Sequence, residues 1–192
     1  MVAARSPRLL TLREYLMIDG VAAAKSELVR GVMYAMTGGT LQHSRITANI
    51  IGVLREKLHG GACAVYDSNL RIWIAKADIA TYPDASVICS DPHFAEDEPR
   101  DTVTNPSVVV EVLSRSTETY DRGDKLVAYQ SCPSMKHCIL VNPDPPSVEV
   151  FTRTAHGGWA VAGATELSAS VVLVHLGIEL PLAELFEGAG GT

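Results

Sequence analysis

The clearest periodic pattern in this sequence is a run of apolar residues at helical spacing. Between His43 and His59 the apolar side chains recur every three or four residues, as one face of an α-helix requires: Ile46, Ile50, Ile51, Val53, Leu54 and Leu58. Gly60 and Gly61 follow, and glycine is common just past a helix C-terminus. The pattern predicts one long amphipathic helix over residues 43–59.

Most of the remaining apolar residues fall in short runs rich in β-branched side chains, which are typical of strands. Residues 26–36 predict two short strands that turn at Arg30 and Gly31. A further helix is expected over residues 11–18, where Thr11 can cap it and Glu14 completes a capping box. Other strands are expected over 62–66, 70–75, 83–89, 108–113, 136–141, 147–153 and 159–162, with the last three continuing one sheet.

Two of these strand runs each carry one carboxylate. Asp84 follows Pro83 at the start of one run, and Glu111 stands among valines in another. A carboxylate in such a run is costly to bury unless something pairs with it, and a divalent cation is the simplest partner for two of them. Oxygen ligands favour Mg²⁺, Mn²⁺ or Ca²⁺, and the backbone carbonyl of Val112 is a candidate third ligand. Alternatively, Asp84 is a turn residue and Glu111 is a paired core carboxylate or lies on an open strand face.

A lysine follows these carboxylates on an expected helix from Arg122 to Gln130, which Asp121 can cap. Lys125 then falls near the first turn, where a cation opposes the helix dipole. A lysine in that position indicates another use for the amine. Because the dipole disfavours a cation there, removal of Lys125 is expected to leave folding intact or slightly improved. The alternative is a solvated surface lysine, which would lose little in that position.

Two other polar residues have a structural interpretation when taken alone. Glu27 begins the first strand of the expected hairpin and is a surface carboxylate by default. His43 begins the long helix, where a neutral imidazole more often satisfies a free backbone group than binds a ligand.

Length and composition fit one domain, since the chain has 192 residues with 47% hydrophobic and 20% charged. We expect this domain to span residues 10–187, between a loose terminus at 1–9 and a frayed end at 188–192. The net charge of -6 disfavours a surface that coats nucleic acid, so any basic groove must be local. The acidic run at 91–101 is expected to be a solvated loop away from such a groove.

The four cysteines have no CxxC or zinc-ribbon spacing, so we expect reduced thiols at Cys63, Cys89, Cys132 and Cys138. The first thirteen residues have no apolar leader-like core, and no later run approaches eighteen apolar residues. These observations predict a soluble, cytoplasmic protein without a membrane partner.

Taken in order, a set of short motifs resembles the PD-(D/E)xK nuclease superfamily and, more narrowly, the Uma-two family of restriction-endonuclease-like proteins. The similarity extends from about Leu10 to Glu187 and rests on order and spacing, because no single motif is specific. The matching segments are Glu27–Gly31, Met36, Gln42-His43, Tyr82-Pro83-Asp84, Val110–Ser114, Asp121–Leu126, Tyr129, Leu140-Val141 and Val148–Val150.

The resemblance implies an α/β (α+β) fold with a restriction-endonuclease-like core, in which helices flank a central mixed β-sheet of four strands and antiparallel strands are added. It also implies Mg²⁺- or Mn²⁺-dependent cleavage of a nucleic acid, with DNA as the expected partner. By matching positions, Asp84 and Glu111 would be metal ligands and Glu27 an additional acidic residue at the same site. Gln42 and His43 are secondary candidates.

One position departs from the superfamily pattern. Leu113 stands where a lysine usually follows the glutamate by two residues, and strand alternation points residues 111 and 113 to the same face. In relatives of the Uma-two type the lysine stands on the next helix, which here is Lys125. The expected catalytic set is therefore Asp84, Glu111, Lys125 and Glu27.

Two other classes of function stay open. The displaced lysine and the acidic charge are compatible with a non-catalytic binding or regulatory module on the same fold. An acidic protein also suits a metal-dependent phosphohydrolase that acts on small nucleotides. A homodimer is expected, because a symmetric dimer matches the two-fold symmetry of duplex DNA.

Overall fold

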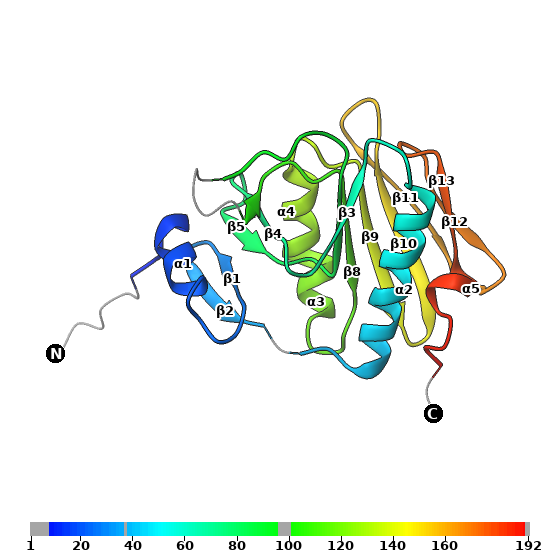
Figure 1. Cartoon of the computed structure of the whole chain (residues 1–192), viewed down its shortest axis with the longest axis horizontal. Helices are drawn as coiled ribbons and strands as arrows, with labels where there is room; N and C mark the ends of the chain where they lie inside the picture. The colour runs from blue at the N-terminus through cyan, green and yellow to red at the C-terminus, as the bar shows by residue number, and fades with distance from the viewer. Residues whose placement is uncertain (1–7, 37, 96–100, 191–192) are drawn as a thin grey trace.

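The computed structural model describes residues 8–36, 38–95 and 101–190. Within these residues the strands form two larger mixed sheets and a small hairpin, with helices packed around them (Figure 1). The predicted mixed α/β (α+β) class is confirmed. Most of the terminus expected at 1–9 and the middle of the acidic run at 91–101 lie outside the described residues.

The larger sheet has the strand order β11-β10-β9-β8-β6-β3. The central pair β8 and β9 is parallel, and the other neighbours are antiparallel. Strands β9, β10 and β11, which come last of the six in the chain, are neighbours in this one sheet, as the sequence predicted. The bounds are β3 Ala64–Asp67, β6 Ala85–Ile88, β8 Val108–Val112, β9 His137–Pro143, β10 Pro146–Arg153 and β11 Trp159–Ala164.

The second sheet has the order β2-β1-β5-β4-β7 and includes the predicted hairpin. Arg30 and Gly31 turn it with φ of 51° and 81°, the left-handed pair that suits a two-residue hairpin loop. Helix α1 (Leu12–Asp19) packs beside this hairpin and carries the predicted capping box of Thr11 and Glu14. The strands are β1 Ser26–Val29, β2 Val32–Ala35, β4 Arg71–Ile74, β5 Ile79–Thr81 and β7 Thr102–Val103.

Strand β8 is buried on both faces, which explains its unbroken apolar run. Its even-numbered valines pack in one core with helix α2 (Leu41–Lys57), α5 (Leu182–Leu185) and the hairpin of β12 (Ser170–Leu173) and β13 (Ile178–Pro181). Val109 and Leu113 pack in a second core with α4 (Leu126–Ser131). Helices α2 and α4 therefore lie on opposite sides of β8 and β9 (Figure 1), and Glu111 belongs to the face toward α4.

The helical segment after β8 starts earlier than the sequence predicted. It runs through α3 (Glu118–Tyr120), a π-helical turn η1 (Asp121–Lys125) and α4, with non-helical dihedral angles at Gly123. The backbone N–H groups of Glu118 and Asp121 already donate to the Ser114 and Thr117 carbonyls, so the hydroxyl-rich turn opens the helix. The expectation that Asp121 caps this helix and that Lys125 lies in its first turn is therefore wrong.

The expectation of four reduced cysteines is also wrong. Cys63 and Cys89 form a disulfide, while Cys132 and Cys138 are free and buried. The bonded residues each stand one position beyond the antiparallel pair Ala64 and Ile88. Register between β3 and β6 brings them together, and a separation of 26 residues in the chain gave no signal of it.

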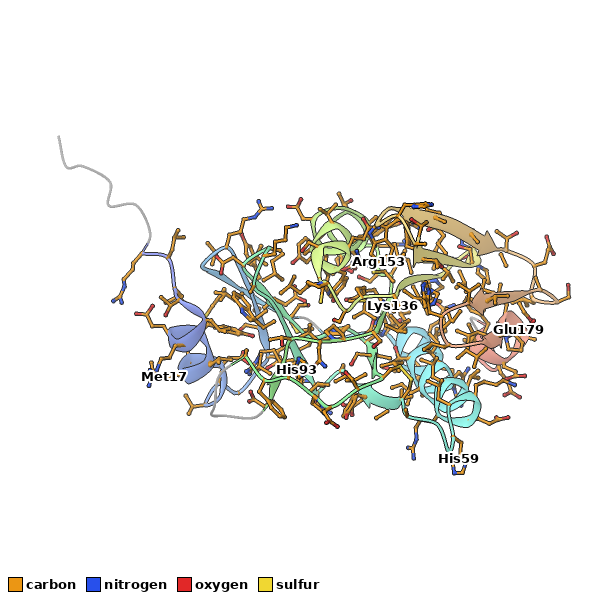
Figure 2. The ribbon with its side chains drawn as sticks, turned by 90° about the horizontal axis from the view of Figure 1, so that it is seen from above. Met17, His59, His93, Lys136, Arg153 and Glu179 are labelled. Atoms are coloured by element: carbon orange, nitrogen blue, oxygen red, sulfur yellow. A yellow bond between two sulfur atoms is a disulfide. The ribbon has the colours of Figure 1, made fainter. Side chains whose placement is uncertain are left out.

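The molecule is elongated, with α1, which carries Met17, and β13, which carries Glu179, near opposite ends (Figure 2). In the described part of the chain, no helix has the length and apolar character needed to cross a membrane.

Candidate active site

A buried cluster of charged side chains is centred on Lys125. Its Nζ lies 2.9 Å from Glu111 Oε1, 3.1 Å from Glu27 Oε1 and 3.5 Å from Asp121 Oδ1. All four side chains are at most 10% exposed. Strands β1 and β8 and the turn η1 thus bring three distant parts of the sequence to one point. Glu27, a surface residue by default in the sequence, is buried here.

Each of the two glutamates also accepts a hydrogen bond from a hydroxyl group. The Tyr129 phenol, on α4, donates to Glu111 Oε1, and the Thr81 hydroxyl, at the end of β5, donates to Glu27 Oε1. Tyr129 and Thr81 are themselves buried. Because each carboxylate accepts from Lys125 and from a hydroxyl, both sheets and α4 fix the cluster in place.

Burial dominates the electrostatics of the cluster. It raises the pKa of Glu111 to about 8, with Asp84 and Asp121 adding to the rise and Lys125 opposing it. Burial also raises the pKa of Asp121. For Lys125, burial alone lowers the pKa, but the charges of Glu111, Glu27 and Asp121 outweigh it and raise the pKa well above its usual value. The lysine is therefore a permanent cation.

Asp84 lies at the N-terminal end of β6 and contacts the end of β8 and the start of α2. Its Oδ2 accepts a hydrogen bond of 2.7 Å from the backbone N–H of Val112 and lies 3.3 Å from His43 Nε2. The hydrogen bond to Asp84 raises the pKa of His43, against the effect of burial, and the hydrogen bond to the Val112 backbone raises it further. His43 is thus paired with a carboxylate, whereas Gln42 donates to the Pro143 carbonyl at 3.4 Å.

The donor set suits a hard divalent cation in type, since it consists of two carboxylates and the carbonyl of Val112. Among the described residues, neither Asp84 Oδ1 nor Glu111 Oε2 accepts a hydrogen bond, so each carboxylate keeps one oxygen free for another partner. No group of three or more His, Cys, Asp or Glu side chains in these residues is arranged to hold a metal ion. A metal would therefore depend on the backbone carbonyl and on water as well.

The sequence profile of Uma2, a family described as "Putative restriction endonuclease", matches residues 12–183. The chain belongs to this family. Two relatives of this chain are named "Uncharacterized protein" in Synechocystis sp. The protein slr1290 is 32% identical over 93% of this chain and 92% of its own length, and sll1609 is 30% identical over 83% of this chain and 89% of its own length.

A solved structure shares the fold of this Uma2 protein. It is the crystal structure of a putative nuclease belonging to DUF820 from Anabaena variabilis, with a TM-score of 0.75 and 21% identity. The match covers 94% of this chain and 99% of that one. The nuclease-like architecture expected from the sequence is thereby confirmed.

Asp121 and Tyr129 belong to the charged cluster around Lys125 but were not identified from the sequence as site residues. The sequence predicts Asp121 to be a helix cap, and it includes Tyr129 among the family's matching positions without indicating what this residue does. The signal that could have found them is spacing, because Asp121, Lys125 and Tyr129 follow one another at intervals of four and share one face of a helix.

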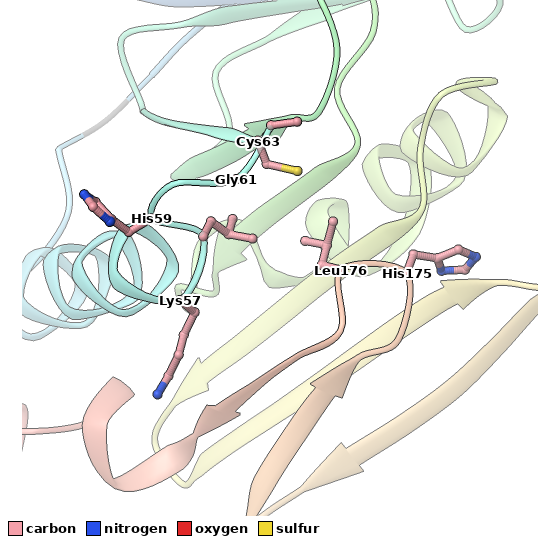
Figure 3. Close-up of a pocket in the computed structure, with 8 residues that line it drawn as sticks. Lys57, His59, Gly61, Cys63, His175 and Leu176 are labelled. Carbon is pink, nitrogen blue, oxygen red and sulfur yellow. The ribbon is translucent and has the colours of Figure 1, made fainter.

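A hollow of about 280 Å³ lies elsewhere on the molecule, beside the C-terminal end of α2. Its lining includes Lys57, His59, Cys63 and His175 (Figure 3). The rings of His59 and His175 point away from each other, and Cys63 is bonded to Cys89, so these groups do not converge on a ligand.

Proposed function

We propose that this Uma2 protein is a Mg²⁺-dependent endonuclease that hydrolyses phosphodiester bonds in DNA, with Mn²⁺ as an effective substitute. The observation that carries the proposal is the position of Lys125, 2.9 Å from Glu111. Leu113, which stands at the usual lysine position, is 3% exposed and packed in the apolar core with α4. Lys125, from the helical turn η1, therefore provides beside Glu111 the amine that is absent at position 113 after β8.

In this proposal Asp84 and Glu111 bind the metal through their carboxylates, and Val112 binds it through its carbonyl. When bound, such an ion neutralises phosphate charge and lowers the pKa of a coordinated water. The N–H of Val112 orients Asp84 through the 2.7 Å hydrogen bond, so one residue serves the site through both of its backbone groups. His43, paired with the same carboxylate, orients it from α2.

Lys125 supplies positive charge and does not accept a proton. Its raised pKa keeps the amine protonated, which suits orientation of the attacking water and stabilisation of negative charge on the phosphate. Glu27 acts as an outer acidic residue that holds the ammonium group at 3.1 Å. Gln42 braces the start of α2 against the end of β9 and has a supporting role.

The experiment that tests the activity is an assay of the purified protein on four substrates: duplex DNA, single-stranded DNA, RNA and nucleotides. We expect cleavage of duplex DNA with Mg²⁺ or Mn²⁺ and none with a chelator. Binding of DNA without cleavage would instead support the regulatory module, and hydrolysis of nucleotides alone would support the phosphohydrolase.

Metal binding has a test that does not depend on cleavage. Calorimetry with Mn²⁺ should detect binding by the parent and its loss in the double variant Asp84→Asn, Glu111→Gln. The matched control is Glu56→Gln with Asp91→Asn, which alters two exposed carboxylates and should bind Mn²⁺ like the parent. Equal binding by the Asp84 and Glu111 variant would exclude this metal site.

We also propose that the protein acts as a homodimer, because two active sites related by a two-fold axis can address both strands of a duplex. Light scattering at micromolar concentration should give twice the mass of the chain. A monomer under these conditions would remove the dimer from the proposal and leave the chemistry of the single site untouched.

A further inference from the structure

Tyr120 stands next to the charged cluster and was not among the residues expected there. It is the last residue of α3, directly before Asp121, and its ring centroid lies 5.9 Å from Lys125 Nζ. Burial raises the pKa of its phenol, and the negative charges of Glu27, Glu111 and Asp121 raise it further. The hydroxyl therefore stays protonated and can donate a hydrogen bond.

The Tyr120 hydroxyl oxygen is buried and has no hydrogen-bond partner among the described residues. Other buried phenols are bonded: Tyr129 donates to Glu111, Tyr15 to the Ser26 carbonyl and Tyr82 to Asp19. Burying an unpaired hydroxyl costs free energy, so most buried polar groups in folded proteins have a partner. Two further buried hydroxyls, of Thr47 and Ser86, are also unpaired, but Tyr120 is the residue whose ring lies beside Lys125 of the charged cluster.

The glutamate oxygens that contact Lys125 already accept hydrogen bonds from other residues. Glu111 Oε1 accepts from Tyr129 and lies beside Lys125, and Glu27 Oε1 accepts from Thr81 and lies beside the same amine. An unpaired O–H donor next to an ammonium group is suited to an anion with several oxygens. A phosphodiester has two non-bridging oxygens that share one negative charge, and it can accept from both donors at once.

We propose that Tyr120 contacts the substrate, its phenol donating a hydrogen bond to a non-bridging oxygen of the phosphodiester beside Lys125. This inference rests on the proposed function and names a group that binds the scissile phosphate. The proton stays on Tyr120, so the residue acts by binding and orientation. No bond to the phenol oxygen forms or breaks.

The test compares Tyr120→Phe with Tyr129→Phe, since each removes one hydroxyl from the same cluster. Three quantities are measured: the melting temperature without metal or nucleic acid, the affinity for a short duplex DNA by fluorescence anisotropy, and single-turnover cleavage with Mg²⁺. Tyr120→Phe should melt at the parent's temperature or above it, bind DNA about tenfold more weakly or worse, and cut at least about tenfold more slowly. Tyr129→Phe should melt at a lower temperature, because its hydroxyl has a protein partner.

If the Tyr120 hydroxyl had only a structural role, Tyr120→Phe would lower the melting temperature and leave the affinity for DNA unchanged. The inference is overturned if Tyr120→Phe melts as low as Tyr129→Phe, or if it binds DNA with the parent's affinity. If the parent binds DNA but does not cut it, the proposed function fails, and the affinity of Tyr120→Phe still decides the inference. A parent that binds no DNA overturns both.

Discussion

At Lys125 one ammonium group meets three buried carboxylates, so removing its charge leaves Glu27, Glu111 and Asp121 close together without a counter-ion. Breaking a buried ion pair on one side usually costs about 3–5 kcal/mol. Lys125→Met should therefore lower the free energy of unfolding by about that amount. The sequence alone, from the position of Lys125 against the helix dipole, predicts the opposite: intact or slightly improved folding. It should also lower the cleavage rate by about 10²-fold or more, the usual scale for a lost catalytic group.

Denaturant unfolding and single-turnover cleavage at saturating metal measure the two effects of Lys125→Met. The control is Lys76→Met, which alters an exposed lysine in the turn after β4 and should change neither quantity. A Lys125→Met protein that is as stable and as fast as the parent would contradict both the structural and the catalytic role.

At the scale of elements, the hairpin of β1 and β2 presents Glu27 to the cluster, and its turn depends on Gly31. This glycine has φ of 81°, and a Cβ added to it would lie 2.6 Å from Leu9 Cβ. Gly31→Ala should destabilise the protein by about 1 kcal/mol or more, because alanine is strained at positive φ and the methyl group has no room. Urea unfolding measures the change.

Gly52 offers a control of the opposite sign. It lies within α2, and an added Cβ would meet no atom within 4 Å. Gly52→Ala should therefore stabilise the protein by roughly 0.5–1 kcal/mol, since glycine is a poor helix former. A Gly31→Ala protein that is as stable as the parent, or more stable, would show that the hairpin turn does not require its left-handed conformation.

At the scale of the whole molecule, His137 joins the larger sheet to the small β12–β13 hairpin. Its Nδ1 lies 3.1 Å from Thr152 Oγ1 on β10, and its Nε2 lies 3.3 Å from the backbone N–H nitrogen of His175. His137 is 0% exposed, and burial lowers its pKa to about 4, with His175 adding to the effect. Between pH 6.5 and 4 the unfolded chain thus binds a proton that the folded protein excludes.

Stability should consequently fall as the pH drops from about 6.5 toward 4, by up to about 3 kcal/mol from His137 alone. His137→Gln should make the free energy of unfolding less dependent on pH over this range, whereas the exposed control His59→Gln should not. Urea unfolding at several pH values measures the slope. An unchanged slope in His137→Gln would mean that other groups cause the acid sensitivity.

The disulfide between Cys63 and Cys89 is a second determinant of global stability. It closes a loop across a separation of 26 residues, for which the loss of chain entropy predicts about 3.5 kcal/mol. The double variant Cys63→Ser, Cys89→Ser should lose about this much. Dithiothreitol should destabilise the parent and leave the variant unchanged, and an equal response of both proteins would exclude a stabilising bond.

The sequence by itself determined the features that depend on local interactions. The apolar spacing before Gly60 set α2, and Arg30-Gly31 set the hairpin turn, because side-chain period and backbone preference act within a few residues. The order of Asp84, Glu111 and Lys125 along the chain, with its spacing, was sufficient to indicate the family. Strand alternation also put Glu111 and Leu113 on the same face of β8.

Only the tertiary structure decided how these elements meet. It buried Glu27 against Lys125, began the helix at Glu118, and joined Cys63 to Cys89 through the register of two strands. Each of these depends on contacts between residues far apart in the chain, for which no periodic signal exists. The carboxylates that keep Lys125 a permanent cation, and the burial that leaves the Tyr120 hydroxyl unpaired, arise in the same way, from the packing of both sheets against the turn η1.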